Sequence, residues 1–262
     1  MVKCLSIKTT ADNEFEVVPI SVPMFPMRAA SDMWSGVDDR PKGLPSKAIQ
    51  CLRLHETGWM LEDVQQLICV LTGELRIFGA TKATLKSGDT ILIEKGLRPE
   101  DAFSFSDDCS ILSLHVPDWV PEAALAAQAE APQVSGPRKP NFKWLYAGAD
   151  RQSYFSECPE FFDETRGWGA TVRPVYSTIF IEMADGFFMD WHAEGANNIV
   201  LILSGELELE TAGGGGDIQR FGPGDICLAV DRTGQGHIDR ARGRTVIANV
   251  VIPSKTLDAP TG

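Results

Sequence analysis

Apolar and polar residues alternate along several short segments of the chain, with glycine and proline residues between the segments. In the segment 206–210, Leu207 and Leu209 alternate with three glutamates, and Leu75 and Ile77 flank an arginine in the same way. A period of two places successive side chains on opposite faces of a strand, so that one face is buried and the other is solvated. Repeated short strands separated by turn residues are typical of β-sandwiches and β-barrels. The pattern therefore predicts an all-β protein.

One segment departs from this pattern near the middle of the chain. Residues 122–130 read Glu-Ala-Ala-Leu-Ala-Ala-Gln-Ala-Glu, which are strong helix formers. The proline-containing segment 132–140 follows and is typical of a linker. We therefore expect a short inter-domain helix between an N-terminal domain of residues 1–135 and a C-terminal domain of residues 136–262.

The strand pattern occurs twice in the sequence. Leu-Thr-Gly-Glu-Leu at 71–75 matches Leu-Ser-Gly-Glu-Leu at 203–207, 132 residues later, and Gly88 and its following aspartate match Gly224 and its aspartate, 136 residues later. The four additional residues correspond to the glycine run 213–216, which we interpret as a hairpin tip because it lacks the Gly-Lys-Ser/Thr ending of a phosphate-binding loop. A long and nearly constant offset indicates a duplicated domain. We expect two copies of one barrel.

The second copy contains polar residues at a characteristic spacing. Between glycines at 186 and 205 lie His192, Glu194 and Asn198, and Gly234-Gln-Gly-His237 follows downstream. These spacings resemble the two signature motifs of the cupin family, with Glu194 in place of the second histidine and Asn198 in place of the usual Glu or Gln. The duplicated chain resembles a bicupin. This resemblance implies tandem double-stranded β-helix (jelly-roll) barrels, which in cupins usually carry one divalent metal.

The resemblance also implies a candidate site in the mouth of the C-terminal barrel, formed by His192, Glu194, Asn198 and His237. Two imidazoles, a carboxylate and an amide oxygen are suitable ligands for Fe(II), Mn(II), Ni(II) or Zn(II). Glu194 is either a ligand or a general base that takes a proton from a metal-bound substrate. Asn198 is either the fourth ligand or a group that orients a ligand by hydrogen bonds.

The N-terminal copy lacks both motif histidines. A thioether and carboxylates are a poor ligand set for a transition metal, so we expect a degenerate barrel without a catalytic metal. His55 and His115 lie in apparent strands outside the motif positions, and we interpret them as ordinary histidines. The residues at the motif positions of this copy are Met60, Glu62, Gln66 and Asp101.

Composition excludes some partners. The net charge is −12, from 36 acidic and 24 basic residues, which argues against nucleic acid because a phosphate backbone requires a basic surface. No stretch is apolar and long enough to predict a membrane span or a signal peptide. The six cysteines form no CxxC pair and are typical of buried reduced thiols. We expect a cytoplasmic protein without a membrane partner.

Three functions are compatible with the sequence. The first is a metal-dependent enzyme of the cupin type, a dioxygenase, isomerase, decarboxylase or lyase, that acts on a small molecule through the C-terminal barrel. The second is a non-catalytic cupin that binds a small metabolite, and the third is a structural bicupin, since one barrel supports many functions. We also expect a homodimer or larger homo-oligomer, because jelly-roll strands leave exposed edges and an N-terminal arm with Pro19, Pro23 and Pro26 is positioned to cover a neighbouring barrel.

Overall fold

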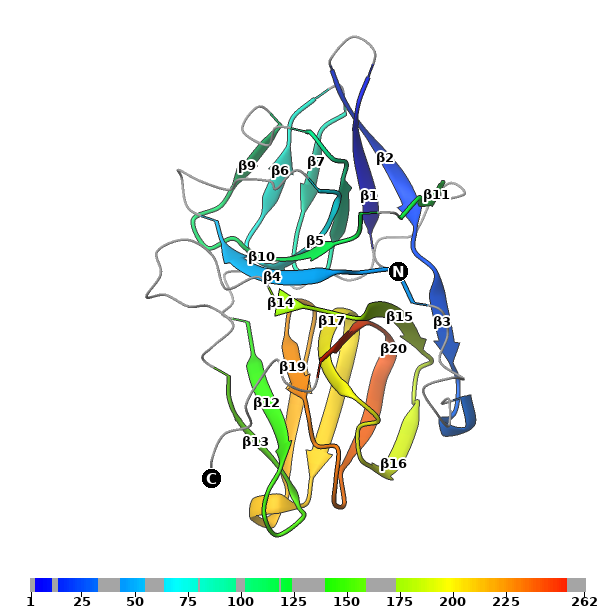
Figure 1. The fold of residues 1–262 in the computed structure, drawn as a ribbon, viewed down its shortest axis with the longest axis vertical. Helices are drawn as coiled ribbons and strands as arrows, with labels where there is room; N and C mark the ends of the chain where they lie inside the picture. Colours follow the sequence, from blue (N-terminus) through cyan, green and yellow to red (C-terminus); the bar gives the residue numbers. More distant parts are fainter. Residues whose placement is uncertain are drawn as a thin grey trace. The chain divides into compact units, whose positions relative to one another are not determined.

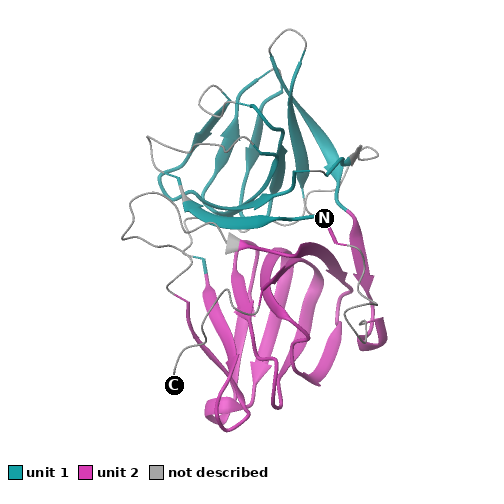
Figure 2. Cartoon of the chain, in the orientation of Figure 1, with its two compact units in different colours: residues 1–22, 45–140, 160–173 teal, residues 23–44, 141–159, 174–262 magenta. Residues whose placement is uncertain are grey.

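The computed structural model describes residues 3–10, 14–32, 43–54, 64–79, 81–97, 102–117, 119–123, 140–158 and 173–253. The chain forms two compact units (Figure 2): unit 1 contains residues 1–22, 45–140 and 160–173, and unit 2 contains residues 23–44, 141–159 and 174–262. The described residues form strands and two short 3₁₀ helices, η1 (Ala30–Asp32) and η5 (Gly213–Gly215), with no α-helix among them. No helix within these ranges is long and apolar enough to cross a membrane. The predicted all-β class is confirmed.

Unit 1 contains two sheets on either side of one apolar core. The large sheet has the order β11-β2-β1-β8-β5-β10-β4 and the small sheet has the order β7-β6-β9 (Figure 1). Ile68 and Val70 of the large sheet and Leu75 and Leu85 of the small sheet are fully buried in the same core. The strands are β1 (Cys4–Thr9), β2 (Phe15–Ser21), β4 (Ala48–Arg53), β5 (Gln66–Thr72), β6 (Leu75–Ile77), β7 (Ala83–Leu85), β8 (Thr90–Ile93), β9 (Phe103–Phe105), β10 (Ser110–His115) and β11 (Glu122–Ala123).

Unit 2 has the same architecture, but two long strands serve both of its layers. Strand β17 pairs with β19 over its first half and with β18 over its second half, and β20 accompanies it over both halves. The order is β13-β12-β19-β17-β20-β15-β3, with β16 paired to β20 and β18 paired to β17 (Figure 1). The strands are β3 (Met24–Met27), β12 (Phe142–Ala147), β13 (Ser153–Glu157), β15 (Ser177–Met183), β16 (Phe188–His192), β17 (Asn197–Thr211), β18 (Asp217–Phe221), β19 (Ile226–Ala229) and β20 (His237–Ile252); β14 (Arg173–Pro174) lies where the chain passes from unit 1 to unit 2.

The two units repeat the same turn at the glycines that the sequence repeat identifies. The Gly88 N–H donates to the Val70 carbonyl at 2.9 Å, and the Gly224 N–H donates to the Ile202 carbonyl at 2.8 Å. Both glycines have a positive φ, +87° and +86°, which favours glycine. In each copy the following aspartate accepts through Oδ2 a hydrogen bond from the backbone N–H three residues before it. The repeated glycine-aspartate signature of the sequence therefore forms the same turn in both units.

The predicted inter-domain helix is wrong at its first two residues. Glu122 and Ala123 form β11 and pair antiparallel with Ser21 and Ile20 of β2. Helix propensity is a weak preference that tertiary contacts override, and here a sheet edge provides the competing hydrogen bonds. The remainder of the predicted helix, residues 124–130, and the linker residues 132–139 lie outside the described residues.

The proline-containing N-terminal arm contributes a strand to unit 2. Strand β3 pairs in parallel with β15, with Pro26 opposite Glu182. Since β3 is the last strand in the sheet order, a proline without an N–H is tolerated there. Residues 23–44 therefore belong to unit 2 by their contacts. The domain boundary at residue 135 stays a prediction from the sequence.

Candidate metal centre

His192 and His237 lie directly opposite each other on adjacent strands of unit 2. His192 ends β16, His237 begins β20, and the two residues are antiparallel partners. Their ring centroids are 4.4 Å apart with an interplanar angle of 52°. The residue before His237 is Gly236, with φ of +80°, and a Cβ there would lie 1.8 Å from the His192 carbonyl oxygen. The close approach of the two strands therefore requires glycine at 236.

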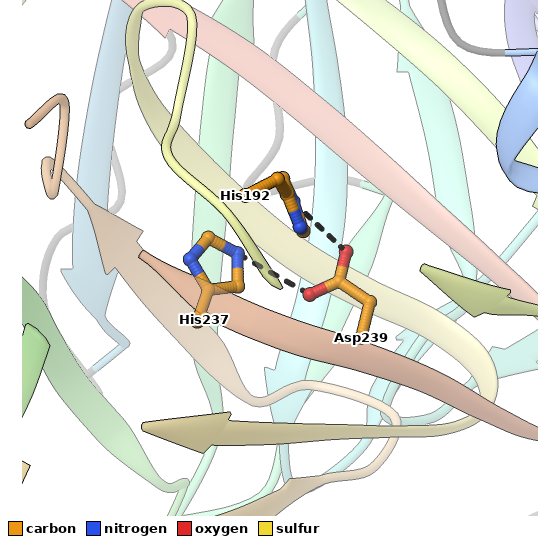
Figure 3. A group of neighbouring side chains, drawn as sticks. All are labelled: His192, His237 and Asp239. Carbon is orange, nitrogen blue, oxygen red and sulfur yellow. Dashed lines mark ion pairs between the residues drawn. The ribbon is translucent and has the colours of Figure 1, made fainter. Parts of the chain in front are cut away.

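A third group, Asp239, completes the cluster (Figure 3). Side chains alternate along β20, so Asp239 projects to the same face as His237. One carboxylate oxygen of Asp239, Oδ1, lies 3.2 Å from Nε2 of His237, and the other, Oδ2, lies 3.8 Å from Nε2 of His192. One ligand atom from each of the three residues lies within 4.8 Å of the other two. The buried Oδ1 is therefore ion-paired with His237 when that ring is protonated, and it becomes available to a metal when the Nε2 proton leaves.

The outer nitrogen of each imidazole has a hydrogen-bond partner. Nδ1 of His192 lies 2.9 Å from the Asp190 carbonyl oxygen, which only accepts, so the proton resides on Nδ1. Nδ1 of His237 lies 2.8 Å from Oδ2 of Asp231, which also accepts the Ser153 hydroxyl at 2.8 Å. In the neutral ring each Nε2 then carries the lone pair that a metal requires. Carboxylate and carbonyl partners of this kind fix the orientation of histidine ligands in metal sites.

The cluster is strongly coupled electrostatically. Burial alone would lower the pKa of His237, but Asp239 and Asp231 raise that pKa well above the ordinary 6.5. Burial alone would raise the pKa of Asp239, but the His237 cation lowers it. Without a metal His237 is therefore an imidazolium ion paired with two carboxylates, and a metal that binds its Nε2 displaces the proton.

Glu194, just before β17, forms a hydrogen bond with Asn198, the second residue of that strand. Nδ2 of Asn198 donates to Oε2 of Glu194 at 2.6 Å, and the Glu194 N–H donates to the Asp231 carbonyl at 3.2 Å. Although Glu194 is only half-buried as a residue, the pKa of its carboxyl group is raised to about 7. Desolvation is the largest cause, His237 opposes it, and Asp231 and Asp239 contribute to the increase. Asn198 is 3% exposed, and its Oδ1 has no hydrogen-bond partner. The role of these two residues as metal ligands stays a prediction.

The structure thus brings together the two histidines of the sequence motif and adds two aspartates that sequence reasoning missed. The sequence contained a signal for Asp239, because a residue two positions after His237 on the same strand must share its face. The sequence contained no such signal for Asp231, because it is in a loop, and its contact with Ser153 joins residues 78 positions apart.

Unit 1 provides no comparable cluster within the described ranges. Among all the described residues of the chain, the only group of three or more His, Cys, Asp or Glu residues with metal-binding geometry is the unit 2 cluster of His192, His237 and Asp239. Gln66 is buried, and its Oε1 accepts the Ser113 hydroxyl at 2.7 Å. His115 is also buried. The other residues named from the sequence, His55, Met60, Glu62 and Asp101, lie outside the described ranges.

No family model matches the sequence, and no curated protein matches it. Cupins are among the solved structures that resemble the chain. A cupin 2 conserved barrel domain protein from Leptotrichia buccalis is 12% identical, with a TM-score of 0.37 over 80% of this chain and 85% of that one. A protein of unknown function from Pseudomonas syringae pv. tomato is 12% identical, with a TM-score of 0.35 over 95% and 99%. Oxalate decarboxylase from Bacillus subtilis, in a study of its Mn(II) centers, is 12% identical, with a TM-score of 0.28 over 83% and 68%. These scores are low, and the fold described above rests on the chain's own strand order and register.

Proposed function

We propose that this chain is a metal-dependent enzyme of the cupin type that acts on a small molecule at unit 2. The observation that carries the proposal is the convergence of His192, His237 and Asp239, whose ligand atoms lie within 4.8 Å of one another. Two imidazoles and one carboxylate bind Fe(II), Mn(II), Ni(II) or Zn(II) and leave coordination positions open for water and substrate.

The residues present fit such a metal on two further grounds. Asp239 Oδ1 is buried beside Nε2 of His237, so loss of the Nε2 proton would leave a buried carboxylate oxygen that a metal can bind. The outer nitrogen of each imidazole is already occupied, so the lone pair of the neutral ring faces the cluster. A bound divalent metal would supply Lewis acidity toward an oxygen of the substrate or of a water molecule.

The remaining residues have distinct roles in this proposal. Asp231 holds His237 in the orientation that presents Nε2. Asn198 fixes Glu194 through Oε2, so the other carboxylate oxygen, Oε1, either takes a proton from the substrate or binds the metal directly. Replacing Glu194 with Gln separates the two roles: lost metal affinity indicates a ligand, whereas retained metal with lost turnover indicates a base.

Metal analysis tests the proposal directly. Protein purified without added metal should contain, or bind on titration with Mn(II) or Zn(II), one tight equivalent per chain. His192→Ala and His237→Ala should abolish this binding while the fold is retained, and Asp217→Asn, a carboxylate change outside the cluster, should leave it intact. A folded protein that binds no metal but is stabilised by a small metabolite would instead favour the non-catalytic binding function. Two equal sites per chain would contradict the restriction to unit 2.

A further inference from the structure

The hairpin formed by β12 and β13 binds the loop that precedes His237. This loop connects β19 to β20 in unit 2. The Gln235 N–H donates to the carbonyl oxygen of Arg151, in the hairpin turn, at 3.0 Å. The Ser153 hydroxyl, at the first position of β13, donates to Oδ2 of Asp231 at 2.8 Å. The hairpin therefore holds the loop near both of its ends.

The hairpin turn has an unusual backbone at the residue that contacts the loop. Within the described ranges, Arg151 is the only residue other than glycine with a positive φ, +66°. This conformation is unfavourable for an L residue, and it persists where surrounding contacts determine the backbone. Here the loop lies against the Arg151 carbonyl, since a Cβ at Gly234 would be 2.3 Å from its oxygen. The strained residue thus marks a close contact between the hairpin and the loop.

The Asp231 carboxylate has two hydrogen-bond partners, and both bind the same oxygen. Oδ2 accepts from the Ser153 hydroxyl and from Nδ1 of His237, each at 2.8 Å. The other oxygen, Oδ1, is buried and has no hydrogen-bond partner among the described residues. In this part of the chain, Ser153 is therefore the one side chain besides His237 whose hydrogen bond fixes the direction of the carboxylate.

Burial makes this support difficult to replace. Ser153 and Asp231 are 0% exposed, and His237 is 2% exposed. When a buried hydrogen-bond partner is removed, the remaining group is left unsatisfied, because water does not take its place. Without the serine hydroxyl the carboxylate would be free to rotate, and the imidazole would follow it. Because Nδ1 and Nε2 belong to one rigid ring, such a rotation moves Nε2 relative to His192 and Asp239.

We propose that Ser153 is a positioning residue of the candidate metal centre. It acts through Asp231, which it holds in the direction that keeps Nε2 of His237 facing Asp239 and His192. Partners beyond the ligands themselves typically change metal affinity by about 10- to 100-fold when they are removed. The inference rests on the metal-dependent function proposed above and adds a residue outside the cupin-like motif.

Metal titration of the full chain tests this role. We expect Ser153→Ala to bind Mn(II) with the stoichiometry of wild type but about tenfold more weakly by calorimetry. Ser156→Ala is the matched control and should bind as wild type does. Ser156 lies on the opposite face of β13, and its buried hydroxyl has no hydrogen-bond partner among the described residues. Equal affinities of wild type and Ser153→Ala, or equal losses in the two variants, would overturn the inference.

A double-mutant cycle separates an effect through Asp231 from a general effect on packing. In Asp231→Ala the serine has no route to His237. The double variant Ser153→Ala/Asp231→Ala should therefore bind Mn(II) as tightly as Asp231→Ala does, within about twofold. A further loss of about tenfold in the double variant would show that Ser153 acts independently of Asp231, and it would refute the positioning role.

Hydrogen exchange in the metal-free protein supplies a second readout. NMR should show that the His237 Nδ1 proton exchanges with water at least about tenfold faster in Ser153→Ala than in Ser156→Ala, because the bond to Asp231 opens more often. If Ser153→Ala does not fold, Ser153→Cys, whose thiol is a weak donor, takes its place with the same expectations.

The two measurements distinguish failure of this inference from failure of the proposed function. Wild-type protein that binds Mn(II), with affinity and exchange unchanged by the Ser153 substitution, would refute only the role of Ser153. Wild-type protein that binds no metal would refute the proposed function and the role of Ser153 within it, whatever the exchange rates.

Discussion

The backbone of Gly236 packs directly against the carbonyl oxygen of His192, so that a Cβ at position 236 would lie 1.8 Å from that oxygen. A real Cβ cannot occupy this position, and either β16 or β20 would have to move. Because His192 ends one of these strands and His237 begins the other, any such movement separates the two imidazoles. The glycine is therefore a structural requirement of the candidate metal centre.

We expect Gly236→Ala to abolish tight metal binding and to lower the free energy of unfolding. Gly243→Ala provides the matched control, since Gly243 has a similar φ of +75° but no atom lies within 4 Å of the position that a Cβ would occupy there. The control should lose only about 1–2 kcal/mol from the left-handed backbone conformation and should retain metal binding. Urea unfolding and calorimetric metal titration measure both quantities. Equal behaviour of the two variants would show that the contact at His192 is unimportant.

Asp239 and Asp231 should differ in their effects on metal affinity. Asp239→Asn removes the carboxylate charge between the two imidazoles, and we expect measurable metal binding to disappear. Asp231→Asn leaves the three ligand side chains in place but weakens the support of His237, so affinity should fall by about 10- to 100-fold. Titrations at one pH with the same metal make the comparison. If Asp231→Asn proved more damaging than Asp239→Asn, the assignment of Asp239 as a ligand would be wrong.

The buried cysteines should be unreactive in the native protein. All six are buried thiols outside any disulfide, and burial raises the pKa of Cys4 and of Cys109 to about 12. Since the thiolate is the reactive form, a disulfide reagent such as DTNB should modify almost no thiol under native conditions and six per chain after unfolding in guanidinium. Rapid labelling of the native protein would contradict the burial seen for these residues.

Repetition and spacing made much of this molecule predictable from its sequence. Gly88 and Gly224 could be aligned because each turn requires a residue with positive φ, and this requirement is visible in the sequence as a glycine at the same place in both copies. His192 and His237 could be paired because the spacing resembled a known motif. The contacts of Asp231 could not be predicted, since they depend on how a loop meets a distant hairpin. The start of the predicted helix failed for a similar reason: Glu122 has a high helix propensity, but the edge of β2 was available to pair with it.

Glu208 accepts hydrogen bonds from two arginines, Arg220 and Arg242, on the outer face of unit 2. Its side chain is 4% exposed, and Oε2 accepts hydrogen bonds from Nε of Arg220 at 2.9 Å and from Nη2 of Arg242 at 2.6 Å. We expect Glu208→Gln to destabilise the protein by about 1–2 kcal/mol at neutral pH, a figure reduced because both arginines are exposed and screened. Glu206→Gln is the control: this glutamate is 42% exposed and contacts the same arginines only at 3.7–3.9 Å. Its cost should be below about 0.5 kcal/mol.

The contribution of Glu208 to stability should disappear in acid. Burial on its own would raise the pKa of Glu208, but the hydrogen bonds from Arg220 and Arg242 lower it below the ordinary 4.5. A carboxyl group whose pKa is lower in the folded state stabilises that state above its unfolded pKa, and this stabilisation is lost as the pH falls through the folded value. The difference in unfolding free energy between wild type and Glu208→Gln should therefore be constant from neutral pH down to about pH 5 and shrink at lower pH. Urea unfolding at a series of pH values measures it, with Glu206→Gln in parallel to account for general acid effects. A difference that stayed constant through the acid range would mean that packing of the side chain, and not its charge, is responsible.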